Sequence, residues 1–238
     1  MDEITEILLY TLAAGVCIPL GGMLASIEKI RPYWLENEFR HFIIAFGGGI
    51  LLSAVSLVLV PEGNRYFSDP ILSVITLLIG GLCFFFLENF LGGEKREKPQ
   101  FSAMLLDYLP ESLALGGAFV LGANSAPLLA IIIGLQNLPE GFNAYRELLS
   151  TPGFNKKRVL GSMFALAPLG PVMAIVGWVY LYEHVVLLGA LMLFASGGIL
   201  YLIFQDIAPQ SRMKHHWAPP LGAVLGFACG MLGDNLIN

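Results

Sequence analysis

The sequence has few charged residues. Of its 238 residues, 31 are charged, 13 of them basic and 18 acidic, whereas an average soluble domain of this length carries about 60. Hydrophobic residues make up 56% of the chain, and the mean hydropathy is +0.71. A water-soluble globule of this composition would expose apolar surface over most of its area. The scarcity of charge therefore excludes a soluble enzyme and a disordered chain, and it predicts an integral membrane protein.

Basic residues and cysteines are also scarce. The formal net charge of -5 leaves no basic patch for nucleic acid. The three cysteines, Cys17, Cys83 and Cys229, are widely spaced in apolar runs. This pattern is typical of small hydrophobic residues and not of a disulfide framework or a thiolate metal site. The chain begins Met-Asp-Glu, which is acidic where a secretory signal peptide is basic, so we expect no such signal.

Long apolar runs take the place of charge. Eight runs come close to the roughly 20 residues that cross a bilayer as a helix. They are continuously apolar and lack the two-residue alternation of barrel strands. The sequence therefore predicts one all-α transmembrane domain over residues 1–238. Its eight spans are expected at residues 4–27, 41–60, 71–90, 101–122, 126–145, 159–181, 185–207 and 219–237.

The basic residues alternate between the two sides of these spans. Twelve of the 13 Lys and Arg residues lie in the loops after the first, third, fifth and seventh runs, and Arg65 alone lies on the other face. Cytoplasmic loops are enriched in Lys and Arg. Both termini are therefore expected outside the cytoplasm.

Two parts of the sequence repeat each other. Residues 46–63 and 194–211 share a Phe, a Gly-rich stretch and a Pro at matching positions, and Leu-Pro-Glu occurs at both 109–111 and 138–140. On the expected topology the paired spans run in opposite directions. Such pairing is typical of the inverted repeats of secondary transporters; the alternative is that short Gly- and Pro-containing apolar strings match by chance.

Acidic side chains lie inside the fourth and fifth spans. A charge at mid-bilayer costs roughly 2.5–3.5 kcal/mol on insertion scales and usually marks a site or pathway. Asp107 and Glu111 share one face of the fourth span, and Gln136 and Glu140 share one face of the fifth. A rise of about 1.5 Å per residue places Glu111 opposite Gln136 and Asp107 opposite Glu140.

A proline precedes a glutamate in each of these spans. Pro110 and Pro139 cannot donate a backbone hydrogen bond, which frees the carbonyls of Leu106 and Leu135. Neither span contains Lys or Arg deep inside it, so protons or a bound cation must neutralise the carboxylates. Carboxylate and carbonyl oxygens suit a divalent metal. The alternatives are a proton relay or the transport of another solute, and a protonated acid pair that holds two helices together.

These motifs resemble those of the ZIP family (Zrt- and Irt-like proteins) of divalent-metal transporters. Residues 107–112, Asp-Tyr-Leu-Pro-Glu-Ser, resemble the family's His-Asn-x-Pro-Glu-Gly motif, and residues 136–141, Gln-Asn-Leu-Pro-Glu-Gly, match the Gln-Asn-x-Pro-Glu-Gly motif of its GufA-like branch. The resemblance implies a 3+2+3 inverted-repeat bundle of eight helices with both ends outside the cytosol. It also implies an elevator or alternating-access carrier that moves Zn²⁺, Fe²⁺ or Mn²⁺ towards the cytosol, with no enzymatic activity and no organic cofactor.

The sequence departs from the family pattern at the site. Asp107 stands where the family has His, Tyr108 where it has Asn, and Ala167 where a Glu precedes Pro-x-Gly. We therefore expect a single intramembrane metal, bound by Asp107, Glu111, Gln136 and Glu140. Further candidates are second-centre or pathway residues (Tyr108, Asn137, Ser53, Ser56 and Asp206) and a cytoplasmic metal-collecting pair (His215 and His216).

Two other interpretations stay open at this point. The departures also fit a transport-inactive relative that acts as a metal sensor or structural partner, and the carboxylates also fit a proton-coupled carrier of another solute. The expected surroundings are the lipid bilayer of the cell membrane, with no nucleic-acid partner. The sequence leaves the metal, the coupling ion and the oligomeric state open, a homodimer being one option.

Overall fold

The computed structural model describes residues 3–27, 33–92, 99–122, 126–213 and 217–237. Within these residues every regular element is a helix, as the apolar runs predict. The α-helices are α1 (Glu3–Ile27), α2 (Tyr33–Ser53), α3 (Val60–Arg65), α4 (Pro70–Gly92), α5 (Pro99–Val120), α6 (Ala126–Ser150), α7 (Lys156–Leu166), α8 (Leu169–Leu181), α9 (Val185–Leu202), α10 (Ala208–Ser211) and α11 (Ala218–Ile237). Two wider π-helical turns are η1 (Ala54–Leu59) and η3 (Ile203–Ile207).

Five of the described helical stretches are long and apolar enough to cross a membrane. They cover Ile4–Ile27, Asn37–Arg65, Pro70–Phe90, Lys156–Leu181 and Val185–Ser211. The protein is thus an all-helical, multi-pass membrane protein. Helices α5, α6 and α11 occupy the other runs in which spans are expected, and the count of eight spans and the position of the termini stay predictions.

The two repeated segments widen at the same point. The π-helical turn η1 ends two residues before Pro61, and η3 ends two residues before Pro209. A proline inside a helix removes a backbone donor and clashes with the preceding turn. A π-helical turn, in which bonds reach one residue further, relieves this conflict. The matching sequence strings therefore produce matching local structure.

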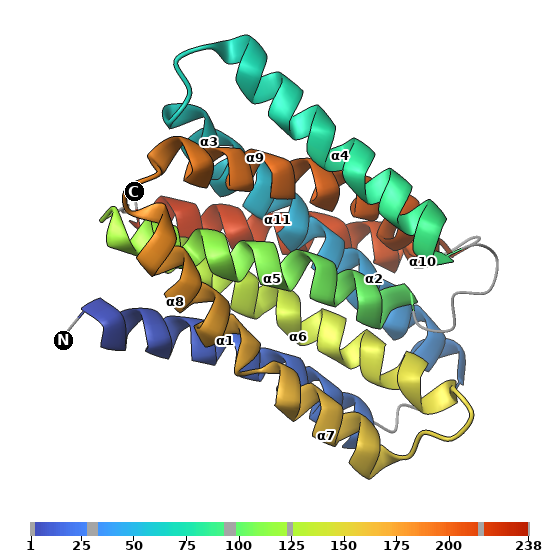
Figure 1. Ribbon diagram of the computed structural model, residues 1–238. Coiled ribbons are helices and arrows are strands. Elements are labelled where there is room, and N and C mark those ends of the chain that lie inside the picture. Colours follow the sequence, from blue (N-terminus) through green and yellow to red (C-terminus); the bar gives the residue numbers. More distant parts are fainter. Residues whose placement is uncertain (1–2, 28–32, 93–98, 123–125, 214–216, 238) are drawn as a thin grey trace.

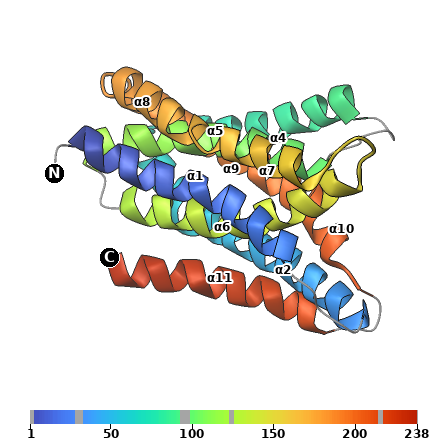
Figure 2. The same cartoon turned by 90° about the horizontal axis from the view of Figure 1, so that it is seen from below.

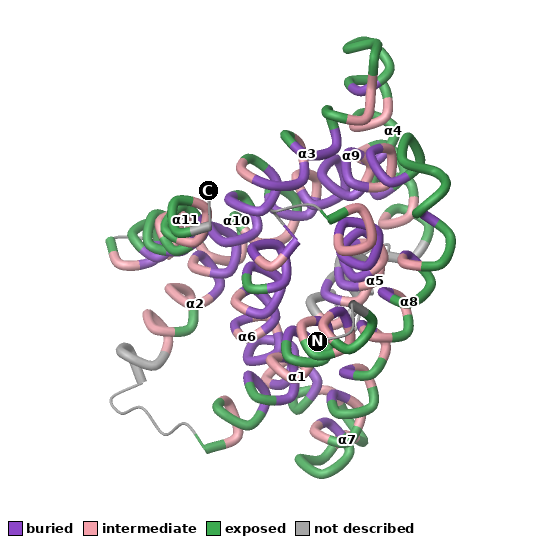
Figure 3. The backbone as a smooth tube through the Cα atoms, turned by 90° about the vertical axis from the view of Figure 1, so that its left-hand side faces the viewer, coloured by how far each residue is buried: buried purple, intermediate pink, exposed green. Residues whose placement is uncertain are grey.

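The helices associate as four close pairs: α1 with α6, α5 with α8, α2 with α11, and α4 with α9. The first two pairs and α7 form the α5–α6 group; α2, α3, α4, α9, α10 and α11 form the α2–α9 group (Figure 1). The groups meet where α2 packs on α6 and α5 packs on α9. Figure 3 shows buried backbone concentrated on these central helices, while α4 and α8 are largely exposed.

Glycines determine how closely the two helices of each pair approach one another. In each pair, one glycine of each helix lies directly against a backbone carbonyl of the partner, so that an added Cβ would overlap that oxygen. Small residues allow membrane helices to approach to this distance. The eight glycines are Gly21 and Gly141, Gly116 and Gly177, Gly49 and Gly226, and Gly80 and Gly197.

Candidate functional site

Glu111 and Gln136 meet in the interior of the α5–α6 group. Gln136 Nε2 donates a hydrogen bond to Glu111 Oε2 at 2.5 Å, and both residues are at most 1% exposed. The depth estimate from the sequence places these two residues opposite each other, and the structure does so. Gln136 Oε1 is buried and has no hydrogen-bond partner among the described residues. The pair therefore gathers a carboxylate and an amide oxygen inside the apolar bundle.

Asn137 fixes the same stretch of α6 to α1. Its Nδ2 donates to the carbonyl of Ala14 at 2.9 Å, and the residue is fully buried. Its Oδ1 is buried with no partner within the described part of the chain. Asn137 therefore holds α6 in place and leaves an acceptor oxygen one residue from Gln136.

Glu140 lies one helical turn further along α6 and lines a cavity between the two helix groups. The polar cavity has a volume of about 40 Å³, room for a few water molecules or an ion. Four polar side chains contribute to its wall: Glu140 and Asn143 of α6, Asp206 of η3 and Gln210 of α10. The remaining lining residues are Ile44, Gly47, Gly48, Met104, Pro139, Leu202 and Ile207.

The polar cavity thus brings Asp206 to Glu140. The sequence offers Asp206 only as a pathway candidate at the edge of the seventh run, and the structure places it in the lining of the same cavity as Glu140. Because they belong to different helix groups, a cation between them would bridge the α5–α6 group and the α2–α9 group.

The predicted four-residue centre is only partly visible. Asp107 belongs to α5, but its side chain lies outside the described residues, as do His215 and His216. Among the side chains that the structure describes, no three His, Cys, Asp or Glu residues gather closely enough to hold a metal. The proposed ligation by Asp107, Glu111, Gln136 and Glu140 stays a prediction.

Tyr108 lies at the junction of α1, α5 and α8. Its hydroxyl donates to the carbonyl of Ala167 at 3.3 Å and lies against Gly15 and Gly170, where no Cβ would fit. The carbonyl of Ala167 is able to accept this bond because the residue four positions later, Pro171, has no backbone N–H. The structure thus gives Tyr108 a place as a hydrogen-bonded contact between three helices.

The two serine candidates bond to their own helix. Ser53 Oγ donates to the carbonyl of Ile50 at 2.6 Å and packs against Gly230 of α11. Ser56 Oγ donates to the carbonyl of Leu52 at 2.7 Å and is exposed. Such local bonding is common for Ser in helices.

Sequence reasoning missed Asn143 and Gln210. Asn143 is 4% exposed, and its Oδ1 has no partner among the described residues. For Asn143 a signal was present in the spacing, because Asn143 lies seven residues after Gln136 and three after Glu140, which places all three on one helix face. For Gln210 the spacing gives no such signal, because the π-helical turn η3 interrupts the regular helical period before it.

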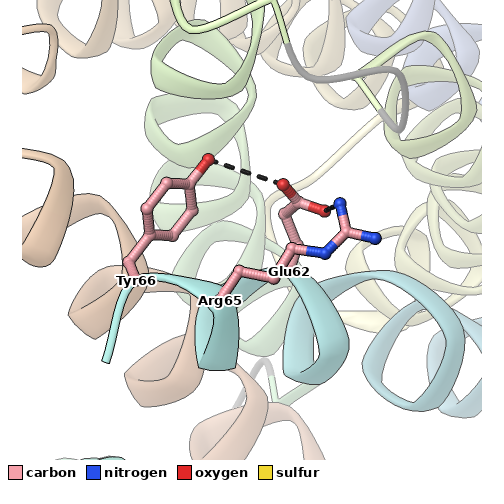
Figure 4. A network of polar contacts seen from close by, with 3 residues as sticks. All are labelled: Glu62, Arg65 and Tyr66. Carbon is pink, nitrogen blue, oxygen red and sulfur yellow. Dashed lines mark hydrogen bonds and ion pairs between the residues drawn. The ribbon is translucent and has the colours of Figure 1, made fainter. Parts of the chain in front are cut away.

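A second polar network lies at the far end of the α2–α9 group. Glu62 is 6% exposed, accepts from Arg65 Nη1 at 2.9 Å and from the Tyr66 hydroxyl at 3.4 Å (Figure 4). Burial, followed by the adjacent negative charge of Glu62, raises the pKa of Tyr66. The ion pair with Arg65 offsets part of the cost of burying the Glu62 side chain.

No known family model matches the chain, and no curated protein sequence matches it. The specificity of the resemblance to ZIP transporters therefore depends on the two short motifs at 107–112 and 136–141.

Proposed function

We propose that the chain is a ZIP-like carrier that moves a divalent metal cation, Zn²⁺, Fe²⁺ or Mn²⁺, across the cell membrane towards the cytosol. The observation that carries the proposal is the row of side-chain oxygens along one face of α6. It begins at the buried Glu111–Gln136 pair and continues through Glu140 to Asn143 in the polar cavity. Carboxylate and amide oxygens are ligands for hard and borderline divalent ions.

Electrostatics favours a cation as the cargo. A buried carboxylate in a membrane helix requires a proton or a counter-charge. Glu111 accepts a hydrogen bond from the neutral amide of Gln136. In the proposed site, a metal held by Asp107, Glu111, Gln136 and Glu140 supplies the positive charge, and protonation of the carboxylates releases it.

The helix packing supports an alternating-access mechanism. Each group is held together by backbone contact at glycines, whereas α2–α6 and α5–α9 join the groups mainly through side chains. In the proposed cycle the α5–α6 group carries the ion past the α2–α9 group. Asp206, contributed by the second group, would meet the ion at Glu140 in the polar cavity.

The packing also supports the inverted repeat. If the first three spans correspond to the last three, and the fourth to the fifth, then the α1–α6 pair corresponds to α8–α5, and α2–α11 corresponds to α9–α4. All four pairs are present. The contacts between the groups, α2–α6 and α5–α9, correspond in the same way.

Uptake of radioactive metal into vesicles that contain the purified protein tests the proposal. Wild type is expected to show saturable uptake of at least one of the three metals. Glu111→Gln keeps an acceptor for Gln136 and Glu140→Gln keeps the size of the side chain, and each is expected to lower uptake at least about tenfold, the effect of 1.4 kcal/mol. Glu183→Gln, at an exposed carboxylate between α8 and α9, is the matched control.

A transport-inactive relative is the second candidate. It is favoured by Tyr108, whose hydroxyl bonds to Ala167 where the family pattern has metal ligands. Metal binding to the detergent-solubilised protein, with wild-type uptake no greater than that of empty vesicles, would overturn transport and favour a sensor. Uptake that is unchanged in both Gln variants would overturn the site.

A further inference from the structure

The polar cavity has a counterpart set of residues elsewhere in the bundle. Residues 46–63 match 194–211 position by position, and residues 109–111 match 138–140. This match carries the lining of the polar cavity onto residues of η1, α5 and α9. The counterpart set consists of Ala54, Val58, Leu59, Glu111, Ala195 and Ser196, which correspond to Leu202, Asp206, Ile207, Glu140, Gly47 and Gly48 of the polar cavity.

The counterpart set is closed to water, whereas the polar cavity is open. Every member of the counterpart set is at most 2% exposed, and its four apolar members belong to one hydrophobic core cluster. Around the polar cavity, the corresponding residues Glu140, Asp206 and Ile207 are partly exposed. Matching segments thus pack tightly at one place and leave space at the other. Rocking of one repeat against the other exchanges two such arrangements in transporters built from inverted repeats.

The two places lie towards opposite ends of the bundle. Figure 2 shows α10, which contributes Gln210 to the polar cavity, beside the beginning of α2. Figure 1 shows α3 at the other end, beside the beginning of α9. A Cβ on Gly189 of α9 would lie 2.8 Å from the carbonyl oxygen of Gly63, so α3 rests directly on α9. Because Glu62 of α3 corresponds to Gln210, it occupies the edge of the counterpart set.

Glu62 is held there by an unusual basic residue. Arg65 is the one Lys or Arg of the chain that lies on its side of the expected spans. Its Nη1 lies 2.9 Å from Glu62 Oε2, and its side chain is 72% exposed while Glu62 is 6% exposed. Removing one partner of such a pair leaves an uncompensated buried charge. Glu62 can therefore stay buried only while Arg65 is bound to it, and without Arg65 it favours contact with water or with another cation.

We propose that the Glu62–Arg65 ion pair is a latch on a second cavity, closed in this structure, which opens along the counterpart set. Opening separates Arg65 from Glu62 and makes Glu62 and Glu111 the carboxylates of this cavity. A divalent cation that enters from the end at α3 then meets Glu62 first and Glu111 next, since carboxylate oxygens are suitable ligands. The inference rests on the proposed carrier function and adds Glu62 and Arg65 to its residues.

Cysteine labelling tests the latch without a transport measurement. Cys17, Cys83 and Cys229 are replaced by Ala, and a single Cys is introduced by Ser196→Cys in the counterpart set. In a second protein it is introduced by Ala144→Cys, at a fully buried residue outside both sets. The detergent-solubilised proteins are treated with a cationic, water-soluble methanethiosulfonate, which reacts only with a thiol that water reaches. Both positions are expected to react slowly while Arg65 is present.

Variants of the ion pair distinguish a latch from general loosening. Arg65→Gln leaves the Glu62 charge unpaired and is expected to speed labelling at position 196 at least about fivefold, with no change at position 144. Adding Glu62→Gln removes the buried charge and should return the slow rate. Arg158→Gln, at an exposed arginine of α7, is the matched control and should change neither rate. Circular dichroism checks folding, and Ala195→Cys replaces Ser196→Cys if that variant fails to fold.

Metal uptake into vesicles separates this inference from the proposed function. Glu62→Gln is expected to raise the KM for uptake several-fold and to leave the maximal rate nearly unchanged, because Glu62 meets the ion only on entry. Labelling at position 196 that ignores Arg65→Gln, an equal rise at position 144, or a double variant that stays fast would each overturn the latch, even with normal uptake. Wild-type uptake no greater than that of empty vesicles, together with the expected labelling rates, would overturn the carrier function and support the latch.

Discussion

The helices of this protein meet at two kinds of interface. Inside each close pair, a glycine lets backbone lie on backbone: Gly226 of α11 rests against the carbonyl of Phe46, and Gly116 of α5 against that of Ala174. Between the groups, a Cβ added to Gly47 of α2 would lie 3.3 Å from the side-chain ring of Pro139 on α6, and one added to Gly117 of α5 would meet a methyl of Leu188 on α9. The interface between the groups also contains the polar cavity.

This difference separates rigid helix contacts, made by backbone, from adjustable ones, made by side chains. Lipid tails are as apolar as Leu, so membrane helices gain stability from close packing and not from leaving water. Backbone contacts at glycine tolerate little displacement, because a carbonyl cannot rotate out of the way. Side-chain contacts allow repacking. Glu140 and Asp206 line the interface between the groups, and the glycines hold together the helices within each close pair.

The largest expected effect comes from closing a backbone contact. Gly226→Ala places a methyl on the carbonyl of Phe46, which must move, and we expect a loss of about 2–3 kcal/mol in stability. Thermal unfolding in detergent, followed by circular dichroism, measures the change. Gly161→Ala is the control, since nothing lies within 4 Å of its added Cβ and alanine favours the helix. Equal unfolding temperatures for the two variants would contradict the description of the pairs.

A smaller effect is expected for the same change between the groups. Gly47→Ala meets only the Pro139 ring, so the stability loss should stay below about 1 kcal/mol. Metal uptake should nevertheless fall several-fold, because Pro139 also lines the polar cavity beside Glu140. Unfolding and vesicle uptake are measured on the same preparation. A stability loss as large as that of Gly226→Ala would mean that the two interfaces do not differ.

Tyr108→Phe sharpens the comparison within the α5–α6 group. It removes the hydrogen bond to the carbonyl of Ala167, together with the contacts of the hydroxyl with Gly15 and Gly170, at an expected cost of about 1 kcal/mol. Tyr180→Phe, at a hydroxyl on the exposed face of α8, should leave the unfolding temperature unchanged. If both variants behave alike, Tyr108 does not join the helices through its hydroxyl.

The smallest effect is expected outside both interfaces, at Tyr66. Because its pKa is raised above 10.0 in the folded protein, the folded state retains the proton longer than the unfolded state. This contribution to stability is complete below about pH 10 and is lost as the pH rises through the raised pKa. Tyr66→Phe should therefore weaken the alkaline decline in unfolding temperature between about pH 9 and 11. Parallel curves for variant and wild type would rule this out.

Much of the helical architecture could be predicted from the sequence because the bilayer imposes simple rules. Apolar run length places the helices, and helical rise alone places Glu111 beside Gln136. Helix pairing could not be predicted in this way, since α4 and α8 present similar apolar faces. The sequence does not distinguish Gly80 and Gly116, which contact a partner helix, from glycines that contact none. Only the fold shows which carbonyl each one meets.

The polar cavity was harder to predict than the buried pair. Asn143 and Gln210 come from helices of different groups, and their side chains have no unusual chemistry in the sequence. In the sequence, Asp206 lies at the edge of a predicted span. In the structure, η3 places it in the lining of the cavity beside α6. A site between two groups depends on their relative placement, which local periodicity does not encode.

The widened turns η1 and η3 interrupt the regular period of the helical segments that contain them. Each π-helical turn accommodates one residue more than an α-helical turn, so the face presented after it is rotated by about a quarter of a revolution. Helical-wheel reasoning carried across residues 54–59 or 203–207 would therefore assign Glu62 and Gln210 to the wrong side. Deleting a single residue within either π-helical turn would restore the regular α-helical period. The segment that follows would then rotate, and Glu62 or Gln210 would turn away from its present neighbours.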